Sequence, residues 1–340
     1  MKMTARALEQ MNAMGKEGKP FFFMIDFLQQ HPVVLPLEAL KAEHIWIDMP
    51  EVRIVGESTH DTPFTEAPSS ALHEVIPSGS FQLVCGGYSK EDYEVQFSSV
   101  QYEIKKGNSY LVNLTCETPV SGNFSLEQLF FVADAKYKLL VKNQFLVFSP
   151  EIFVRMVDGC IYSYPMKGTV DAERPDAAQF LLTNLKEKAE HSTIVDLIRN
   201  DLSMVANHVQ VNRFGYLDEL TTSNGRLLQM SSEISGVLPT DYCSHVGDII
   251  FNLLPAGSVT GAPKDKTVDI ILNVETYDRG YYTGVFGVFD GKNLDSAVMI
   301  RFIEQTDHGL VYKSGGGITA MSNLDDEYNE MLKKIYVPIR

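Results

Sequence analysis

The chain has 340 residues, of which 44% are apolar, and a formal net charge of −15. Its length and composition suffice for a sizeable buried core, and we expect one compact, enzyme-sized unit. The negative charge argues against a nucleic-acid partner, because binding to phosphate backbones depends on a basic surface. An anionic ligand would need a metal ion or a local arginine to reverse the field within its site.

The cysteines and the N-terminus indicate the cellular compartment. The cysteines are far apart, and no histidine lies at zinc-ligand spacing from them: Cys85, Cys116, Cys160 and Cys243. We therefore expect reduced thiols and neither a disulfide framework nor a zinc site. The N-terminus lacks the apolar stretch of a secretory signal, and no window approaches the ~18 apolar residues of a membrane span. The sequence predicts a cytoplasmic protein without a membrane partner.

The first third of the chain predicts mixed elements. Short apolar runs between residues 20 and 48 predict strands at the edge of a sheet, with a helix around residues 37–42. Residues 56–80 are rich in Pro, Ser, Thr and Gly and predict a long surface connection. Apolar residues at helical spacing predict a helix over residues 90–106, with Gly107 as its C-terminal cap.

The rest of the chain continues in mixed blocks. A strand is expected at residues 110–115, followed by a helix that Ser125 and Gln128 open as a capping box. Alternating apolar residues predict strands over residues 137–170. Further helices are expected from Pro175 to Val205, on both sides of residues 254–264, and at residues 325–335. Because strands and helices do not alternate regularly, the pattern favours an α+β layered fold over a doubly wound parallel sheet.

Two acidic pairs share one spacing, Glu187 with Glu190 and Glu327 with Glu330. A spacing of three places both carboxylates of a pair on one helical face. Two such helices meeting at a cleft would offer up to four oxygen ligands to a hard cation, of which Mg²⁺ is the natural choice. The alternative is that both pairs lie on solvated helix faces of an acidic protein.

Glycine-rich runs at residues 254–264, 279–284 and 314–319 indicate a pocket for a small acid. The first run fails the template of a nucleotide-binding loop, because its second glycine comes four residues after the first. Its amides and hydroxyls can approach a small ligand before a helix that starts near Pro263, although an ordinary loop is the alternative. The glycines 315–317 are expected to follow a strand, where they allow a carboxylate to approach the backbone or form a structural bulge.

Three charged residues complete the candidate set. Arg301 lies in a strand-like apolar run and requires either a ligand carboxylate or a structural ion pair. Glu151 directly follows Pro150, Lys167 comes two residues after Pro165, and both lie near expected strand ends. A lysine that is shielded from water beside a cation would lose its proton more easily, as a nucleophile must. The alternative is an exposed lysine in a turn.

In this order, the motifs together resemble the chorismate-utilising enzymes, which include anthranilate, aminodeoxychorismate, isochorismate and salicylate synthases. The similarity covers residues 125–335, with EHSTIVDLIRNDL, GSVTGAPK, RGYYTG, IR and GGGI as its motifs. Residues 1–120 would then be a shortened, more divergent N-terminal part of one catalytic domain spanning residues 1–340. The resemblance implies an α+β sandwich of two facing antiparallel sheets, with helices outside and the site in a cleft between them.

The resemblance also implies a role for each candidate residue. Glu190 and Glu330 would hold Mg²⁺ on the ring carboxylate of chorismate, and the other member of each acidic pair would support them. The other binding residues would hold a substrate carboxylate (Arg301, Tyr282 and the amides of Gly315, Gly316 and Gly317) or line the ring pocket (Gly257, Ser258 and Thr260).

Within the family, the run from Pro165 to Thr169 resembles aminodeoxychorismate synthase component I, since anthranilate synthases usually carry alanine in place of Lys167. The implied reaction converts chorismate and ammonia to 4-amino-4-deoxychorismate, for 4-aminobenzoate and folate synthesis. Lys167 would attack C2 as the C4 hydroxyl departs, with Glu151 as general acid, before ammonia displaces the lysine. The sequence lacks a glutaminase motif, so a separate glutamine amidotransferase subunit is expected to supply ammonia.

Three positions depart from the family pattern. Gln229 stands where the family often has histidine, Phe302 replaces the threonine after the arginine, and Met321 replaces the aspartate after the glycines. We interpret them as variation in the ligand pocket, where Gln229 can still form hydrogen bonds. The alternatives are anthranilate synthase component I and a catalytically silent chorismate-binding subunit. The sequence also lacks the Leu-Leu-Glu-Ser run of tryptophan-regulated members, which predicts no feedback by tryptophan.

Overall fold

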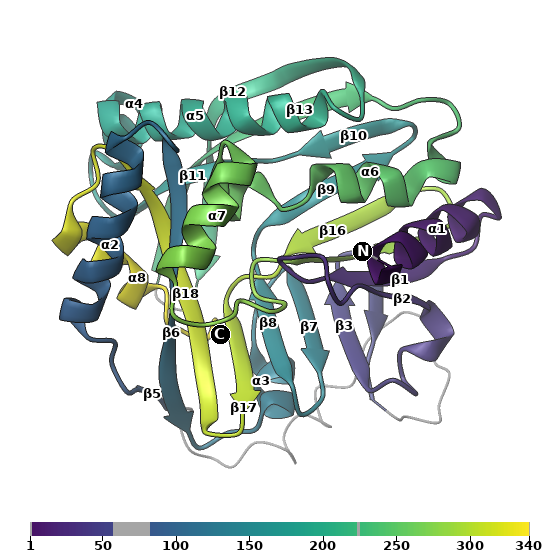
Figure 1. Cartoon of the computed structure of the whole chain (residues 1–340), viewed down its shortest axis with the longest axis horizontal. Helices are drawn as coiled ribbons and strands as arrows, with labels where there is room; N and C mark the ends of the chain where they lie inside the picture. Colours follow the sequence, from purple (N-terminus) through teal and green to yellow (C-terminus); the bar gives the residue numbers. More distant parts are fainter. Residues whose placement is uncertain (1, 57–81, 223–224, 340) are drawn as a thin grey trace.

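The computed structural model describes residues 2–56, 82–222 and 225–339. Within these residues the strands form two antiparallel sheets of nine strands each, and helices flank them (Figure 1). The predicted α+β class with two facing antiparallel sheets is therefore confirmed. The surface connection expected at residues 56–80 lies, apart from Gly56, outside the described residues.

The first sheet joins distant parts of the chain, because β1, near the N-terminus, pairs with β15, about 260 residues later. Its strands, in the order in which they neighbour one another, are β11 (Met166–Asp171), β13 (Gly225–Val237), β10 (Cys160–Ser163), β9 (Ile152–Val157), β16 (Leu294–Val298), β15 (Val285–Phe289), β1 (Phe21–Ile25) and β2 (Val33–Pro36), with β12 (Asn207–Thr222) paired to β13.

The second sheet contains the glycine-rich strand, β18, which pairs with β6 over residues 310–319. Its strands follow one another as β14 (Gly261–Ala262), β6 (Leu111–Gly122), β18 (Gly309–Thr319), β17 (Phe302–Thr306), β8 (Phe145–Ser149), β7 (Tyr137–Val141), β3 (Ile45–Met49) and β4 (Val52–Ile54), with β5 (Leu83–Cys85) paired to β6.

The helices agree with the sequence patterns except in two places, and the first helix, Lys2–Lys16, was not predicted. They are α1 (Lys2–Lys16), α2 (Lys90–Lys105), α3 (Leu126–Val132), α4 (Ala177–Thr183), α5 (Leu185–Leu202), α6 (Val246–Leu253), α7 (Lys264–Val274) and α8 (Leu324–Lys333). The helix expected at residues 37–42 is a short 3₁₀ turn, Leu37–Ala39. The stretch expected from Pro175 is two helices, because the side chain of Asn184 accepts a hydrogen bond from the amide of Glu187 and opens a new helix. Among the described residues, none of the helices is both long and apolar enough to cross a membrane.

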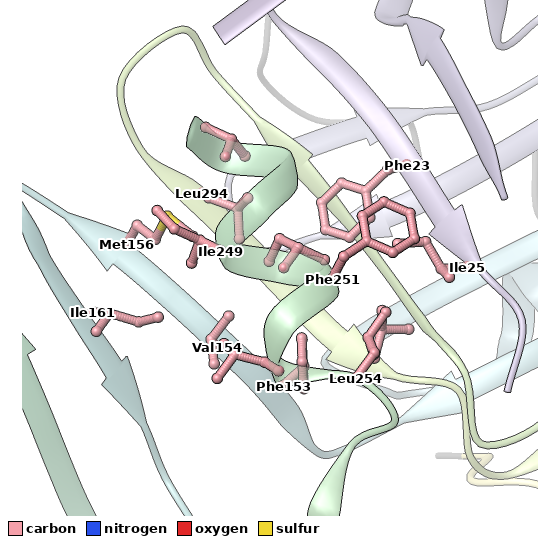
Figure 2. Packing of buried hydrophobic residues seen from close by; sticks show 14 of the residues in the cluster. Phe23, Ile25, Phe153, Val154, Met156, Ile161, Ile249, Phe251, Leu254 and Leu294 are labelled. Atoms are coloured by element: carbon pink, nitrogen blue, oxygen red, sulfur yellow. The ribbon is translucent and has the colours of Figure 1, made fainter. Parts of the chain in front are cut away.

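Apolar packing holds the layers together. Phe22 and Met24 of β1 pack between the two sheets, whereas Phe21, Phe23 and Ile25 face the helices on the outer side of the first sheet. Both faces of β1 are covered, which explains its continuous apolar run. Figure 2 shows Ile249 and Phe251 of α6 packed among Phe23, Ile25, Val154, Met156 and Leu294 of the first sheet. Burying each such side chain contributes about 1.5–3 kcal/mol.

Candidate active site

The candidate residues come from both sheets and from the helices that cover them. β11 carries Lys167 beside α5, and β18 carries the glycines beside α8. Gly168 has a positive φ of 78°, and a Cβ atom there would lie 2.8 Å from Oε2 of Glu187. Only glycine therefore allows β11 to pass this close to the acidic face of α5.

The glycines of β18 bring the remaining acidic residues close to the lysine. A Cβ atom on Gly316 would lie 3.6 Å from Oε2 of Glu327 and 3.7 Å from Oε1 of Glu330, and one on Gly317 would lie 3.7 Å from Nζ of Lys167. The register with β6 is regular across these residues, so they form neither a bulge nor a turn after a strand. The glycines lie inside β18, which corrects the expectation that they follow a strand.

Lys167 makes an ion pair at the centre of this arrangement. Its Nζ lies 3.2 Å from Oε2 of Glu190, and the two side chains are 25% and 13% exposed. Lys167 is thus not an exposed lysine in a turn. It follows the first residue of β11 and pairs across the sheet with Met230.

The charge state of Lys167 differs from the expectation of an easily lost proton. Burial lowers its pKa, but the charges of Glu190 and Glu330 and the hydrogen bond to Glu190 together raise the pKa above its ordinary value. A cation that took these carboxylates as ligands would offset the charges that hold the proton. The expected loss of the proton therefore depends on a cation at these carboxylates.

A second lysine, Lys334, belongs to the same group and was missed from the sequence. Its Nζ lies 2.8 Å from Oε1 of Glu330 and donates a hydrogen bond to the carbonyl oxygen of Gly315 at 2.8 Å. Burial lowers the pKa of Lys334, and the positive charges of Lys167 and Arg301 lower it further. The charge of Glu330 raises this pKa but does not outweigh them. The spacing of four residues between Lys334 and Glu330 is typical of an ion pair on a helix, but it does not indicate that the lysine lies at the site.

Glu151 lies between β8 and β9, where the Ser258 hydroxyl donates a hydrogen bond of 2.5 Å to its Oε1. Burial raises the pKa of the Glu151 carboxyl, although this hydrogen bond and the positive charges of Arg301, Lys334 and Lys167 act in the opposite direction. A raised pKa favours the protonated form, as a general acid requires.

Arg301 lies outside the strand in which it was expected. It lies in the connection between β16 and β17 and has a positive φ of 54°. Residues other than glycine rarely adopt this backbone conformation. Its guanidinium carbon lies 5.3 Å from the centre of the Tyr336 ring. Its buried Nε has no hydrogen-bond partner among the described residues. A ligand carboxylate would satisfy this donor.

The remaining pocket candidates differ in their surroundings. Tyr282 is 3% exposed and meets Phe302 edge to face. Thr260 is fully buried, and its hydroxyl donates to the carbonyl oxygen of Ala256 within the loop. Gln229 precedes Met230, which is the strand partner of Lys167. Because side chains alternate along a strand, Gln229 points to the face of the sheet opposite to that of Met230 and Lys167.

The other two departures from the family pattern lie in different environments. Phe302 is fully buried and stacks on Phe145, with ring centres 4.8 Å apart. Met321 is 71% exposed, so this departure lies on the surface. A groove between α2 and α7, lined by Tyr102 and Lys266 among others, contains none of the candidate residues.

The acidic residues fit a magnesium ion in their chemistry, since carboxylate oxygens are its usual protein ligands. Oxygens of Glu327 and Glu330 lie within 3.7 Å of one point on β18, and Glu190 reaches the same region through Lys167. Across the described ranges, no three His, Cys, Asp or Glu side chains are grouped as a ready-made metal site. Lys167 pairs with Glu190 and Lys334 pairs with Glu330, so a cation would compete with these two ammonium groups for the carboxylates.

Comparison with known proteins gives a family and several relatives. A family model described as chorismate binding enzyme matches residues 57–340. A PabA-like protein of Haemophilus influenzae is 50% identical over 98% of this chain and 96% of its own length. The aminodeoxychorismate synthase component 1 of Salmonella typhimurium is 31% identical over 72% of this chain and 56% of that protein. The anthranilate synthase component 1 of Saccharomyces cerevisiae is 30% identical over 83% and 57%. This chain therefore spans little more than half of either synthase.

Solved structures share the fold at low sequence identity. A putative 2,3-dihydroxybenzoate-specific isochorismate synthase from Bacillus anthracis superposes with a TM-score of 0.67 over 98% of this chain and 86% of the other, at 18% identity. An anthranilate synthase component I from Streptococcus pneumoniae gives a TM-score of 0.64 over 93% and 89%, at 20% identity. These likenesses concern the fold alone.

Proposed function

The chain belongs to the chorismate binding enzyme family, and from that premise we propose that it is an aminodeoxychorismate synthase component I. It would convert chorismate and ammonia to 4-amino-4-deoxychorismate. The observation that carries the proposal is the position of Lys167, whose Nζ lies 3.2 Å from Glu190 and faces the glycines of β18. An anthranilate synthase, which aminates C2, does not need an amine at this point.

The two displacements use Lys167 and Glu151 in turn. Nζ of neutral Lys167 forms a bond to C2 as the bond between C4 and its hydroxyl breaks, and Glu151 donates the proton with which the hydroxyl leaves as water. Ammonia then forms a bond to C4 while the bond between C2 and Nζ breaks, which returns the electron pair to the lysine. The ammonium formed at C4 loses a proton, and Glu151 regains its own. Two successive displacements retain the configuration at C4.

The binding roles follow from charge. Arg301, with its unpaired Nε, would hold a substrate carboxylate. The amides of the glycines in β18 would lie close to the ring, because no side chain separates backbone from ligand there. Mg²⁺, held by Glu190 and Glu330, would offset the charge of the ring carboxylate. Chorismate is a dianion, and the chain itself has a net charge of −15. Arg301 and Mg²⁺ would supply the positive charge that the two carboxylates of chorismate need.

Ammonia would come from a glutamine amidotransferase subunit. The relatives named component 1 support this part of the proposal, since the name implies a second component. The chain spans 56% of the aminodeoxychorismate synthase and 57% of the anthranilate synthase, so the partner is proposed from chemistry and not from shared length.

The test is product identity. The protein is incubated with chorismate, Mg²⁺ and an ammonium salt, and the product is treated with a lyase that releases 4-aminobenzoate from 4-amino-4-deoxychorismate. Formation of 4-aminobenzoate supports the proposal, and release of anthranilate without a lyase overturns it in favour of anthranilate synthase. Calorimetric binding of chorismate without turnover, also in the presence of an amidotransferase, would instead indicate a silent subunit.

A further inference from the structure

One buried lysine joins the ends of three helices next to the candidate active site. Lys264 is the first residue of α7, and its Nζ lies 2.9 Å from Oδ2 of Asp201, near the end of α5. The same Nζ donates a hydrogen bond of 2.7 Å to the carbonyl oxygen of Leu253, the last residue of α6. The lysine and aspartate side chains are 16% and 9% exposed.

The position of Lys264 is unfavourable for α7 itself. A helix N-terminus carries a partial positive charge, so a cation in the first turn opposes the helix dipole. Asp201 and the carbonyl end of α6 offset this charge, since helix C-termini favour cations. The contact therefore stabilises the junction between the helices and the loop that connects α6 to α7, residues 254–263.

The ion pair lies at the C-terminal end of this loop and also packs against its middle. A Cβ atom on Gly257 would lie 2.9 Å from Oδ2 of Asp201, so the loop is packed directly against the ion pair. The next residue, Ser258, donates the hydrogen bond of 2.5 Å to Glu151. Two consecutive residues of the loop therefore contact Asp201 and the proposed general acid, Glu151.

The helix that carries Asp201 also carries Glu187 and Glu190. Helix α5 spans Leu185–Leu202 and packs against the 3₁₀ turn Gly257–Val259 as well as against β11. Because a helix moves as a rigid element, its contact with the loop relates the position of Ser258 to that of the acidic pair.

We propose that the Asp201–Lys264 ion pair is a positioning device, which holds Ser258 against Glu151 and keeps this hydrogen bond in register with the glutamates of α5. The inference rests on the proposed function for its effect on turnover. Neither Asp201 nor Lys264 is assigned a contact with the substrate. Their role is to fix where the proton donor stands.

The chain offers a matched control in the second sheet. Nζ of Lys138 lies 2.9 Å from Oδ2 of Asp48 and donates to the carbonyl oxygen of Ala133 at 3.2 Å, in a site where the lysine is 9% exposed. Lys138→Met and Lys264→Met therefore remove the same chemical contacts at similar burial. Both should lower Tm, and Lys264→Met more than Lys138→Met, because Asp201 loses the cation that pairs with it whereas Asp48 keeps Arg53, whose Nε lies 3.5 Å from its Oδ2.

Turnover separates the two variants. We expect Lys264→Met to lower kcat for chorismate consumption about tenfold or more while KM changes less than about threefold, because misplacing a catalytic group slows the reaction more than it weakens binding. Lys138→Met should leave both within about twofold. Adding Ser258→Ala to Lys264→Met should cause little further loss, and Lys264→Arg should restore part of kcat. An unchanged kcat in Lys264→Met, or losses that multiply with Ser258→Ala, would overturn the proposal.

Two measurements keep the inference testable on its own. Crystal structures of the wild type and of Lys264→Met report the distance between Ser258 and Glu151 whatever the reaction is, and we expect the contact to be lost in the variant. A preserved contact contradicts the positioning role even if the proposed function fails. Should Lys264→Met not fold, Asp201→Asn removes the negative charge of the same ion pair and should produce the same loss of kcat and of the contact between Ser258 and Glu151.

Discussion

Nζ of Lys167 lies 3.2 Å from Oε2 of Glu190, which joins the edge strand of the first sheet to the helix that covers it. Glu330, on a helix that covers the second sheet, contributes to the electrostatic field at the same ammonium group. Lys167 is thus placed among several carboxylates, where the proposed dianionic substrate would bind, and its charge state depends on what occupies those carboxylates.

The first prediction concerns this amine. Lys167→Ala and Lys167→Met should each lower amination of chorismate by at least about 10³-fold, because the covalent route through C2 is lost. The methionine variant keeps most of the buried stem, so its Tm should stay closer to that of the wild type. The measurement is kcat with ammonium salt, together with mass spectrometry of protein trapped with chorismate.

A covalent adduct at Lys167 would distinguish a nucleophilic role of this lysine from a role in packing alone. Wild-type protein should gain the mass of the dehydrated substrate at Lys167, and neither variant should gain it. A turnover-competent alanine variant would require a different nucleophile, and the proposed mechanism would then be wrong.

Much of the fold could be predicted from the sequence, because its signals are local. The capping box of Ser125 and Gln128 opens α3 as expected, and Gly107 follows α2 with a positive φ of 80°. The break between α4 and α5 was missed, since the periodicity continues across Asn184 and only its side-chain contact shows the new start. Strand order could not be predicted, because the pairing of β1 with β15 joins residues far apart in the sequence.

The candidate site was predictable where a motif identified the residue and not where geometry decides. Lys334 lies one turn after Glu330, but nothing in the sequence distinguishes it from its exposed neighbour Lys333. The left-handed backbone of Arg301 has no local signal, since its apolar neighbours favour a strand. The raised pKa of Lys167 depends on Glu330, which the fold brings close from another part of the chain.

The second prediction is a pH dependence that Glu151 controls. Its pKa is raised by burial, and a general acid works in its protonated form. The kcat should therefore fall as the pH rises through this raised pKa, and Glu151→Gln should lower kcat and abolish that limb of the profile. Ser258→Ala removes a hydrogen bond that lowers the pKa, so the limb should move to higher pH. A limb that moves to lower pH, or that persists in Glu151→Gln, would contradict the assignment.

The third prediction concerns Lys334, whose ammonium lies 2.8 Å from Glu330. Lys334→Met should tighten Mg²⁺ binding about fivefold in the absence of substrate, since ~1 kcal/mol of repulsion between nearby like charges is removed. The same variant should weaken chorismate binding, because the site loses a positive charge. Calorimetry with Mg²⁺ alone and with chorismate measures both effects.

The adjacent lysine provides the control for that experiment. Lys333 is exposed and lies on the same helix, so Lys333→Met changes the net charge of the protein by the same amount. It should leave both affinities within about twofold, because solvent screens an exposed charge. Equal effects of the two variants would mean that overall charge, and not the contact with Glu330, sets the affinity.

The fourth prediction concerns the space next to Gly316 on β18. A Cβ atom on Gly316 would lie no closer than 3.6 Å to its neighbours Glu327 and Lys334, which is ordinary van der Waals contact, so Gly316→Ala should fold with a Tm close to that of the wild type. If the substrate approaches the backbone here, the added methyl group should raise the Kd of chorismate about tenfold, or about 1.4 kcal/mol. Gly315→Ala is the contrasting variant, because its Cβ would lie 2.3 Å from the carbonyl oxygen of Leu114 and should destabilise β18 by about 1–3 kcal/mol. Unchanged chorismate binding in a folded Gly316→Ala protein would show that the ligand does not contact this part of the strand.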